Sequence, residues 1–183
     1  MKVSYAITVC DELEEIKRLV DFLISNKHKE DDIVILFDQS KGTQEVITYL
    51  DTIKSEGCLV SNRFEGHFAD CKNLLSSHCT GDFIFQIDAD EHLPEELIDL
   101  LHQILEANPE VDLYYVPRIN TVSGLTPEHI QKWGWRVQNG RVNWPDYQIR
   151  IYRNNPEIKW ENKVHEKIVG FKQYTTLPAV DEL

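Results

Sequence analysis

The chain has 183 residues, 42% of them hydrophobic, and a formal net charge of -12 at pH 7. This length is sufficient for a domain with its own hydrophobic core, and we expect residues 1–183 to form a single domain. The acidic excess argues against a protein that binds nucleic acid or anionic membranes, because such surfaces need clustered Lys and Arg.

The sequence contains no apolar run close to the roughly 20 residues that a membrane-spanning helix needs. Its first residues lead directly into a strand pattern, without the hydrophobic segment of a signal peptide. The four cysteines, Cys10, Cys58, Cys71 and Cys79, lack the spacing of paired or zinc-binding cysteines. We therefore expect free thiols and a cytoplasmic protein, and the oligomeric state stays open.

Strand patterns alternate with helix patterns over the first two-thirds of the sequence. Strands are expected at residues 3–9, 32–37, 58–61, 83–87 and 112–119. Amphipathic helices are expected between them, the first opened by an Asp11–Glu14 capping box, the third ended by Gly81 and the fourth covering 94–107. This alternation predicts right-handed βαβ crossovers and an α/β fold with a mostly parallel, Rossmann-like sheet.

The regular alternation fades after Pro117, where glycines, prolines and an Asn139-Gly140 turn interrupt the sequence. Two further strands are expected at residues 147–153 and 163–169. We expect the last third of the chain to form an irregular layer over the sheet.

Three acids, Asp88, Asp90 and Glu91, follow the buried strand pattern at residues 83–87. Carboxylates crowded at one strand end repel each other unless a cation lies among them, and ligands of α/β sheets bind at this end of the strands. Asp88 and Asp90 point the same way on an extended strand, as ligands of a hard divalent ion would. The alternative is a solvated acidic loop that caps the next helix.

Four segments resemble family 2 of the nucleotide-sugar glycosyltransferases, which have the A-type glycosyltransferase fold, and their combination is similar to bacterial and phage glucosyltransferase-like members. The first segment has Asp11-Glu12 where the family usually has Asn-Glu. The four segments are residues 7–16; residues 37–40 with Asp38; Lys72-Asn73 followed by the DXD segment Asp88-Ala89-Asp90; and residues 144–154 followed by Val164-His165-Glu166. The resemblance makes residues 1–119 the nucleotide-binding half and residues 120–183 the acceptor-binding and catalytic half.

The resemblance implies a nucleotide-sugar donor, expected to be a UDP-hexose such as UDP-glucose. Asp38 would then accept a hydrogen bond from uracil or ribose, and Lys72 would face the anionic ligand. The loop residues Val9, Asp11 and Glu12 would pack against the base, and the DXD segment with Ala89 would complete the site.

A Mg²⁺ or Mn²⁺ ion is the expected cofactor, because the diphosphate leaving group is highly charged. Asp90 is the first candidate ligand, and Asp88 would contact the ribose or reach the metal through water. The resemblance makes His165 the next candidate, and its imidazole would favour Mn²⁺. The alternative for His165 is an ordinary hydrogen-bonded histidine at the sheet edge.

Transfer to a hydroxyl acceptor, expected on a glycan, needs a general base. Asp146 matches the family's position for that base, with Glu91 and Glu166 as rivals; Asp146 could instead cap its strand or pair with Arg150. Arg150 and Arg153 could contact the diphosphate or the acidic side chains after residue 87.

Trp133, Trp135 and Trp144 could stack on sugar rings over the donor pocket or form a small second core.

The resemblance favours an inverting glycosyltransferase. Two other functions stay open. A nucleotidyltransferase would need a basic, glycine-rich loop after the first strand, whereas Cys10-Asp11-Glu12 is acidic. A non-catalytic sugar-nucleotide or glycan-binding module is the other alternative, because the sequence stops soon after Glu166.

Overall fold

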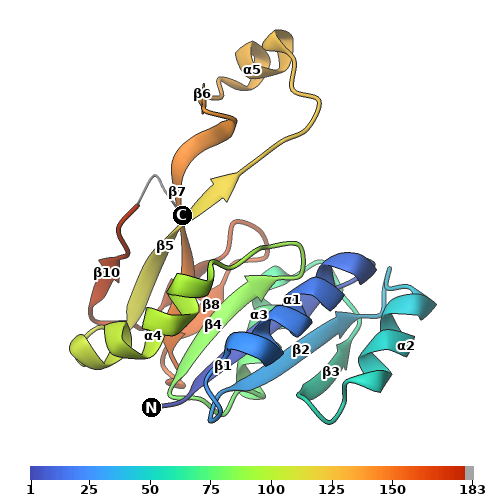
Figure 1. Ribbon diagram of the computed structural model, residues 1–183, viewed down its shortest axis with the longest axis vertical. Coiled ribbons are helices and arrows are strands. Elements are labelled where there is room, and N and C mark those ends of the chain that lie inside the picture. The colour runs from blue at the N-terminus through green and yellow to red at the C-terminus, as the bar shows by residue number, and fades with distance from the viewer. Residues whose placement is uncertain (180–183) are drawn as a thin grey trace.

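The computed structural model describes residues 1–179, in which strands and helices alternate as expected (Figure 1). The helices are α1 (Leu13–Asn26), α2 (Gln44–Thr52), α3 (Phe68–Ser77), α4 (Glu95–Ala107) and α5 (Pro127–Trp133). The strands are β1 (Val3–Val9), β2 (Asp32–Asp38), β3 (Cys58–Asn62), β4 (Phe83–Asp88), β5 (Leu113–Asn120), β6 (Val137–Gln138), β7 (Arg141–Arg153), β8 (Lys159–Glu161), β9 (Lys167–Val169) and β10 (Tyr174–Thr176). No helix in this part of the chain is long and apolar enough to cross a membrane.

Eight of the described strands form one sheet in the order β10-β5-β7-β4-β1-β2-β3, with β6 paired to β7. β1, β2, β3 and β4 are parallel neighbours, which confirms the expected mostly parallel sheet. β7 is antiparallel to both β4 and β5 and separates them. The fifth expected strand therefore does not lie next to the fourth, because a later segment of the chain is inserted between them.

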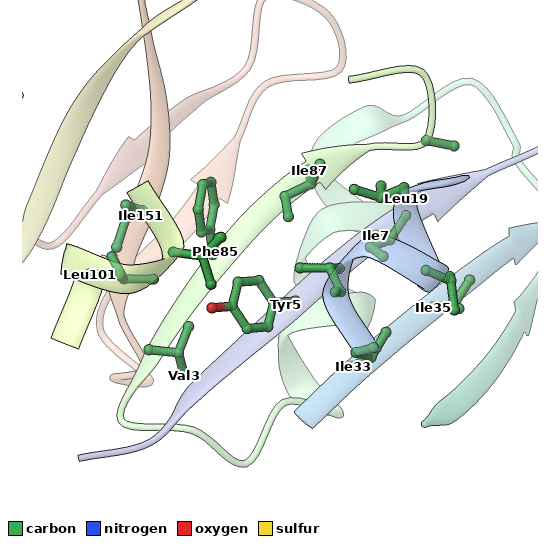
Figure 2. Close-up of a cluster of buried hydrophobic side chains, with 14 of the residues drawn as sticks. Val3, Tyr5, Ile7, Leu19, Ile33, Ile35, Phe85, Ile87, Leu101 and Ile151 are labelled. Atoms are coloured by element: carbon green, nitrogen blue, oxygen red, sulfur yellow. The ribbon is translucent and has the colours of Figure 1, made fainter. Parts of the chain in front are cut away.

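The sheet is covered on both faces. Helices α1, α2 and α4 pack on one face around Tyr5, Ile7 and Phe85 of β1 and β4 (Figure 2). Helix α3 and the β8–β9 hairpin cover the other face, where Ile84 belongs to a second buried cluster. The apolar run of β4 is thus buried on both sides, as its composition predicts for a central parallel strand.

Two expected helix signals are wrong. The side chain of Asp11 does not cap α1; instead the Glu12 carboxylate accepts hydrogen bonds from the N–H groups of Cys10 and Asp11, at 2.8 and 3.1 Å. Helix α3 ends before Gly81, at Ser77. A Cβ atom at Gly81 would lie 2.6 Å from the backbone nitrogen of Ser4, so this glycine allows two chain segments to approach closely.

The segment after β5 also differs from the expected irregular layer. Residues 121–144, which we call the arm, contain α5, β6 and the start of β7, and they project from the sheet instead of lying over it (Figure 1). The reason is that β5 and β7 pair as far as Asn120 and Val142, well beyond the point where β7 leaves β4. The last expected strand is shorter than residues 163–169, because β9 begins only at Lys167.

Candidate active site

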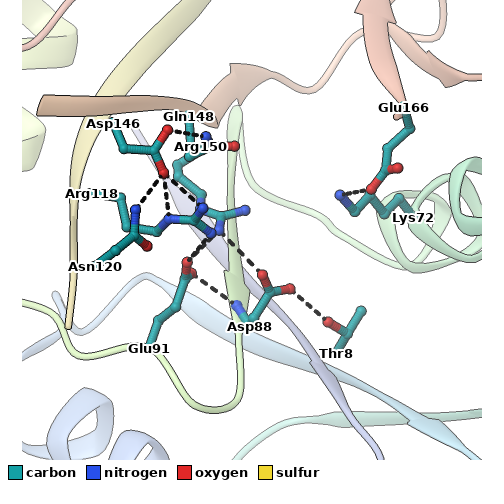
Figure 3. A network of polar contacts seen from close by, with 10 residues as sticks. All are labelled: Thr8, Lys72, Asp88, Glu91, Arg118, Asn120, Asp146, Gln148, Arg150 and Glu166. Carbon is teal, nitrogen blue, oxygen red and sulfur yellow. Dashed lines mark hydrogen bonds and ion pairs between the residues drawn. The ribbon is translucent and has the colours of Figure 1, made fainter. Parts of the chain in front are cut away.

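A buried arginine contacts two of the three acids at the end of β4. The Arg150 guanidinium donates to Asp88 Oδ2 at 3.2 Å and, from the same nitrogen, to Glu91 Oε1. Asp88 also accepts from the Thr8 hydroxyl at 3.1 Å, and its backbone N–H donates to Glu91 at 3.1 Å. A cation from β7 therefore lies between two of the crowded carboxylates and partly offsets their charge (Figure 3). Arg153 does not join them; it pairs with Asp112 at 3.1 Å.

Asp146 lies on β7 opposite Arg118 of β5. Its Oδ2 atom accepts from Arg118 Nε and Nη2 at 3.1 and 2.8 Å and from Asn120 at 2.8 Å, while Oδ1 accepts from Gln148 at 2.8 Å. Burial raises the pKa of Asp146, but the donors of Asn120, Arg118 and Gln148 outweigh burial and hold this pKa below the ordinary value. The hydrogen-bond donors around Asp146 thus favour its charged form. Its ion pair is with Arg118, not with Arg150.

Glu91 connects these two groups. Its Oε1 atom lies 3.7 Å from Arg118 Nη1 and also accepts from Arg150. Burial raises the pKa of Glu91 above its usual range, although the Arg150 charge opposes the increase. We refer to Asp88, Glu91, Arg118, Asp146 and Arg150 as the carboxylate–arginine network.

The DXD residues have different surroundings. Asp90 is exposed, Ala89 between them is buried, and Asp88 is half-buried. Within residues 1–179 no group of three or more His, Cys, Asp or Glu side chains is arranged around a common metal position. His165 lies in the loop between β8 and β9 and lines a pocket of about 280 Å³, which Gln148 and Arg150 of β7 also line. Mg²⁺ is commonly held by one or two carboxylates together with substrate phosphates, and exposed Asp90 beside Asp88 fits that mode.

The pocket at His165 contains a second ion pair. Lys72 of α3 donates to Glu166 at 2.6 Å, and its ammonium lies 4.2 Å from the centre of the Trp160 ring. Asn73 holds the backbone of Trp160 through two hydrogen bonds of 2.9 Å. The resemblance pointed to Lys72-Asn73 and to Glu166, but no sequence pattern singles out Trp160. Burial raises the pKa of the Glu166 carboxyl, but the hydrogen bond from Lys72 outweighs burial, and the pKa lies below its ordinary value.

The candidate nucleotide residues lie around the ends of β1 and β2. Asp38 Oδ1 accepts from the N–H groups of Ser40 and Phe64, at 2.8 and 3.0 Å, so its carboxylate also organises its own loop. Burial raises the pKa of Asp38, but these hydrogen bonds outweigh it and lower the pKa overall. Val9 is buried at the end of β1, and Asp11 and Glu12 form the turn after it.

Arg118 and Asn120, which hold Asp146, carry no sequence signal of their own. Their contact with Asp146 can be recognised only from the pairing of β7 with β5, because Asn120 and Asp146 are 26 positions apart in the sequence. The candidate residues Val9, Asp11, Glu12, Asp38, Asp88, Asp90 and Glu91 lie at the carboxyl ends of β1, β2 and β4, and Asp146 and Arg150 lie on β7. His165, Lys72 and Glu166 lie on other elements, and Trp133 and Trp135 lie in the arm. The strand-end placement expected for ligands of an α/β sheet is therefore present.

The model of the family described as "Glycosyl transferase family 2" matches residues 4–173. The chain belongs to this family. A TPR repeat-containing protein of Synechococcus elongatus is 26% identical over 167 residues, which are 91% of this chain and 35% of that protein. The chain thus spans about a third of the length of this curated relative.

Crystal structures of S. aureus TarS share the fold. The complex of TarS residues 1–349 with UDP superposes with a TM-score of 0.62 at 16% identity, covering 97% of this chain and 61% of TarS 1–349. The complex with UDP-GlcNAc gives a TM-score of 0.61 at 15% identity, covering 99% and 60%. At this identity the superposition shows the A-type fold, while the residues of the site have to be interpreted from their own geometry.

Proposed function

We propose that this protein is a metal-dependent, inverting glycosyltransferase that moves a hexose from a UDP-hexose, such as UDP-glucose, to a hydroxyl group of a glycan. The carboxylate–arginine network carries the proposal, because it brings the acids after β4 and the candidate base Asp146 to one edge of a family 2 fold. The UDP complexes of TarS support UDP as the nucleotide.

Asp90, with Asp88 beside it, would hold the Mg²⁺ or Mn²⁺ ion, and His165 remains a further candidate ligand. When bound, the ion neutralises the charge of the diphosphate leaving group as a Lewis acid. Arg150 supplies a fixed positive charge at the same strand end. Asp38 and Lys72 remain the candidates for the nucleoside and the anionic part of the donor.

Asp146 is the proposed base that takes the proton from the acceptor hydroxyl. Its Oδ2 atom already accepts three hydrogen bonds, whereas Oδ1 accepts one, from Gln148. Oδ1 is therefore the oxygen with capacity for the hydroxyl. Glu91 is a weaker candidate, since its Oε1 atom contacts two arginines and its Oε2 atom accepts from the backbone N–H of Asp88. Glu166, which pairs with Lys72, remains a rival.

Two alternatives make different predictions for the same screen. A nucleotidyltransferase would release pyrophosphate, and a non-catalytic module would bind nucleotide sugars without turnover. The glycosyltransferase would release UDP from one UDP-sugar, faster in the presence of a glycan acceptor, and form a glycosidic bond of inverted anomeric configuration. A screen in Mn²⁺ that contains nucleotide sugars, and separately nucleoside triphosphates paired with sugar 1-phosphates, distinguishes the three functions, with product configuration determined by NMR. Release of pyrophosphate from a nucleoside triphosphate and a sugar 1-phosphate, without transfer from any nucleotide sugar, would overturn our proposal.

The arm is the proposed acceptor subsite. Trp133 is 48% exposed; its ring stacks on that of His129 at a centroid distance of 4.9 Å and is tilted by 40° against that of Trp135 at 4.7 Å. None of the residues of α5 is buried, so this aromatic stack is not a second core. Aromatic faces of this kind bind sugar rings well.

We expect Trp133→Ala to raise the KM for the acceptor by roughly 10-fold, as the loss of one stacking contact would. UDP affinity and melting temperature should stay close to wild type, because the ring is exposed. Steady-state kinetics with varied acceptor measure the effect. Tyr174→Ala is the control, since Tyr174 is an exposed aromatic residue on the edge strand β10. Equal acceptor KM values for the two variants would place the subsite elsewhere.

A further inference from the structure

Arg150 occupies an irregular position in β7. The pairing of β5 with β7 shifts between Tyr114↔Ile151 and Tyr115↔Ile149, which leaves Arg150 as an extra residue. The ladder between β4 and β7 ends at the same place, with Phe85↔Ile151. A bulge of this kind redirects a side chain. Here the side chain is turned toward the acids at the end of β4 (Figure 3).

The guanidinium holds two carboxylates through one atom. Asp88 Oδ2 and Glu91 Oε1 both contact Nη2 of Arg150, so a single positive centre already bridges them. Only 9% of the Arg150 side chain is exposed, and 18% of that of Glu91. Water therefore screens the Arg150–Glu91 pair weakly, while the Asp88 side chain is 40% exposed. A second cation at the position of the guanidinium would be repelled.

We propose that Arg150 is a built-in counter-ion that occupies the position of a divalent cation between Asp88 and Glu91 whenever the nucleotide is absent. The position is then closed to free metal ions. Without nucleotide, a divalent ion finds exposed Asp90 and a half-buried Asp88 that is already paired with a fixed positive charge. With nucleotide, the diphosphate adds the negative charge that the ion requires.

The consequence for the proposed function is an ordered site, in which the metal enters only together with the diphosphate. This step rests on the proposed function, but the occupancy of the position by Arg150 does not. A nucleotide-free experiment therefore tests the role of Arg150 separately. Its failure would leave the glycosyltransferase proposal intact, and the reverse also holds.

The experiment measures the melting temperature in EDTA and in 1 mM Mn²⁺ without nucleotide, for wild type, Arg150→Gln and Arg150→Lys. Wild type should shift by less than about 1 °C. Arg150→Gln should melt lower in EDTA and gain about 5 °C in Mn²⁺, because the vacated position binds the ion and binding to the folded state raises stability. Arg150→Lys keeps the positive charge and should gain nothing.

Two further variants exclude a general structural effect. Arg153→Gln removes the neighbouring arginine of β7, whose partner Asp112 lies outside the network. It should melt lower without any gain in Mn²⁺. Adding Glu91→Gln to Arg150→Gln removes one of the two carboxylates and should abolish the gain.

If Arg150→Gln does not fold in EDTA, refolding in Mn²⁺ and in EDTA is compared, and recovery of folded protein only in Mn²⁺ supports the proposal. Equal Mn²⁺ shifts for wild type and Arg150→Gln, or equal refolding yields in the two buffers, would overturn it. A gain for Arg153→Gln as large as for Arg150→Gln would do the same. Direct titration of Mn²⁺ by electron paramagnetic resonance gives an independent binding constant for each folded variant.

Discussion

Asp146→Asn should lower turnover by ~10²-fold or more while UDP affinity remains nearly unchanged, as expected for the loss of a general base. The amide has the shape of the carboxylate but cannot accept the proton of the acceptor hydroxyl. The donor site is spared, because the hydrogen bonds of Asp146 go to Arg118, Asn120 and Gln148. Single-turnover kinetics and calorimetric UDP binding on the same preparation measure the two quantities.

The hydrogen-bond partners of Asp146 can also pair with the asparagine of the Asp146→Asn variant. The amide oxygen can face Arg118 and Asn120, and the amide nitrogen can face Gln148, whose own amide can turn to present its oxygen. We therefore expect a melting temperature close to wild type. Gln148→Ala is a matched control that removes one hydrogen bond of Asp146 but leaves its carboxylate in place. If Asp146→Asn turns over normally, the base is Glu91 or Glu166.

The pH dependence of turnover distinguishes two of these carboxylates. A base must be deprotonated, so the rate falls as the pH drops through its pKa. Burial favours a higher pKa for Asp146, but its donors outweigh burial, and the acid limb should lie below the ordinary aspartate range. Burial gives Glu91 a raised pKa, so the acid limb would lie above the ordinary glutamate range if Glu91 were the base. A pH–rate profile of kcat measures this limb.

The fold was largely predictable, because its parallel half is built from local patterns. β4 is an apolar run of the length and composition of a central strand, and α1 and α4 show their buried faces in sequence. The insertion of β7 between β4 and β5 was not predictable, since strand order depends on pairing between residues such as Ile84 and Tyr152. The helix end expected at Gly81 was wrong because a tertiary approach to Ser4 explains that glycine.

The candidate site was predictable where the chemistry lies on consecutive residues. Asp88, Asp90 and Glu91 form one sequence cluster, and their crowding by itself indicates that a cation lies nearby. The amino-acid order does not show which cation is present. Arg150 reaches these acids across 59 residues of the chain, through a bulge that has no sequence signal of its own. Trp160 was missed for a similar reason, because its contacts are with Lys72 and Tyr152.

UDP should bind roughly 10²-fold more tightly in Mn²⁺ than in EDTA, a difference of about 2.8 kcal/mol. The chain has a net charge of -12, and a diphosphate that approaches Asp88, Asp90 and Glu91 is repelled unless positive charge is added. Arg150 supplies one positive charge but already contacts Asp88 and Glu91. Some UDP binding should therefore remain in EDTA, and the rest depends on the ion.

Asp90→Ala should abolish this metal-dependent part, so that UDP affinity becomes the same in Mn²⁺ and in EDTA. Asp90 is exposed, and its loss should leave the fold intact. Asp99→Ala is the matched control, because it removes an exposed aspartate of α4 that lies outside the candidate site. Calorimetric titration of UDP into both variants, in each buffer, gives the four affinities required. If wild type binds UDP equally in Mn²⁺ and in EDTA, the ion has no part in donor binding, and Arg150 and Lys72 become the cations that the diphosphate meets.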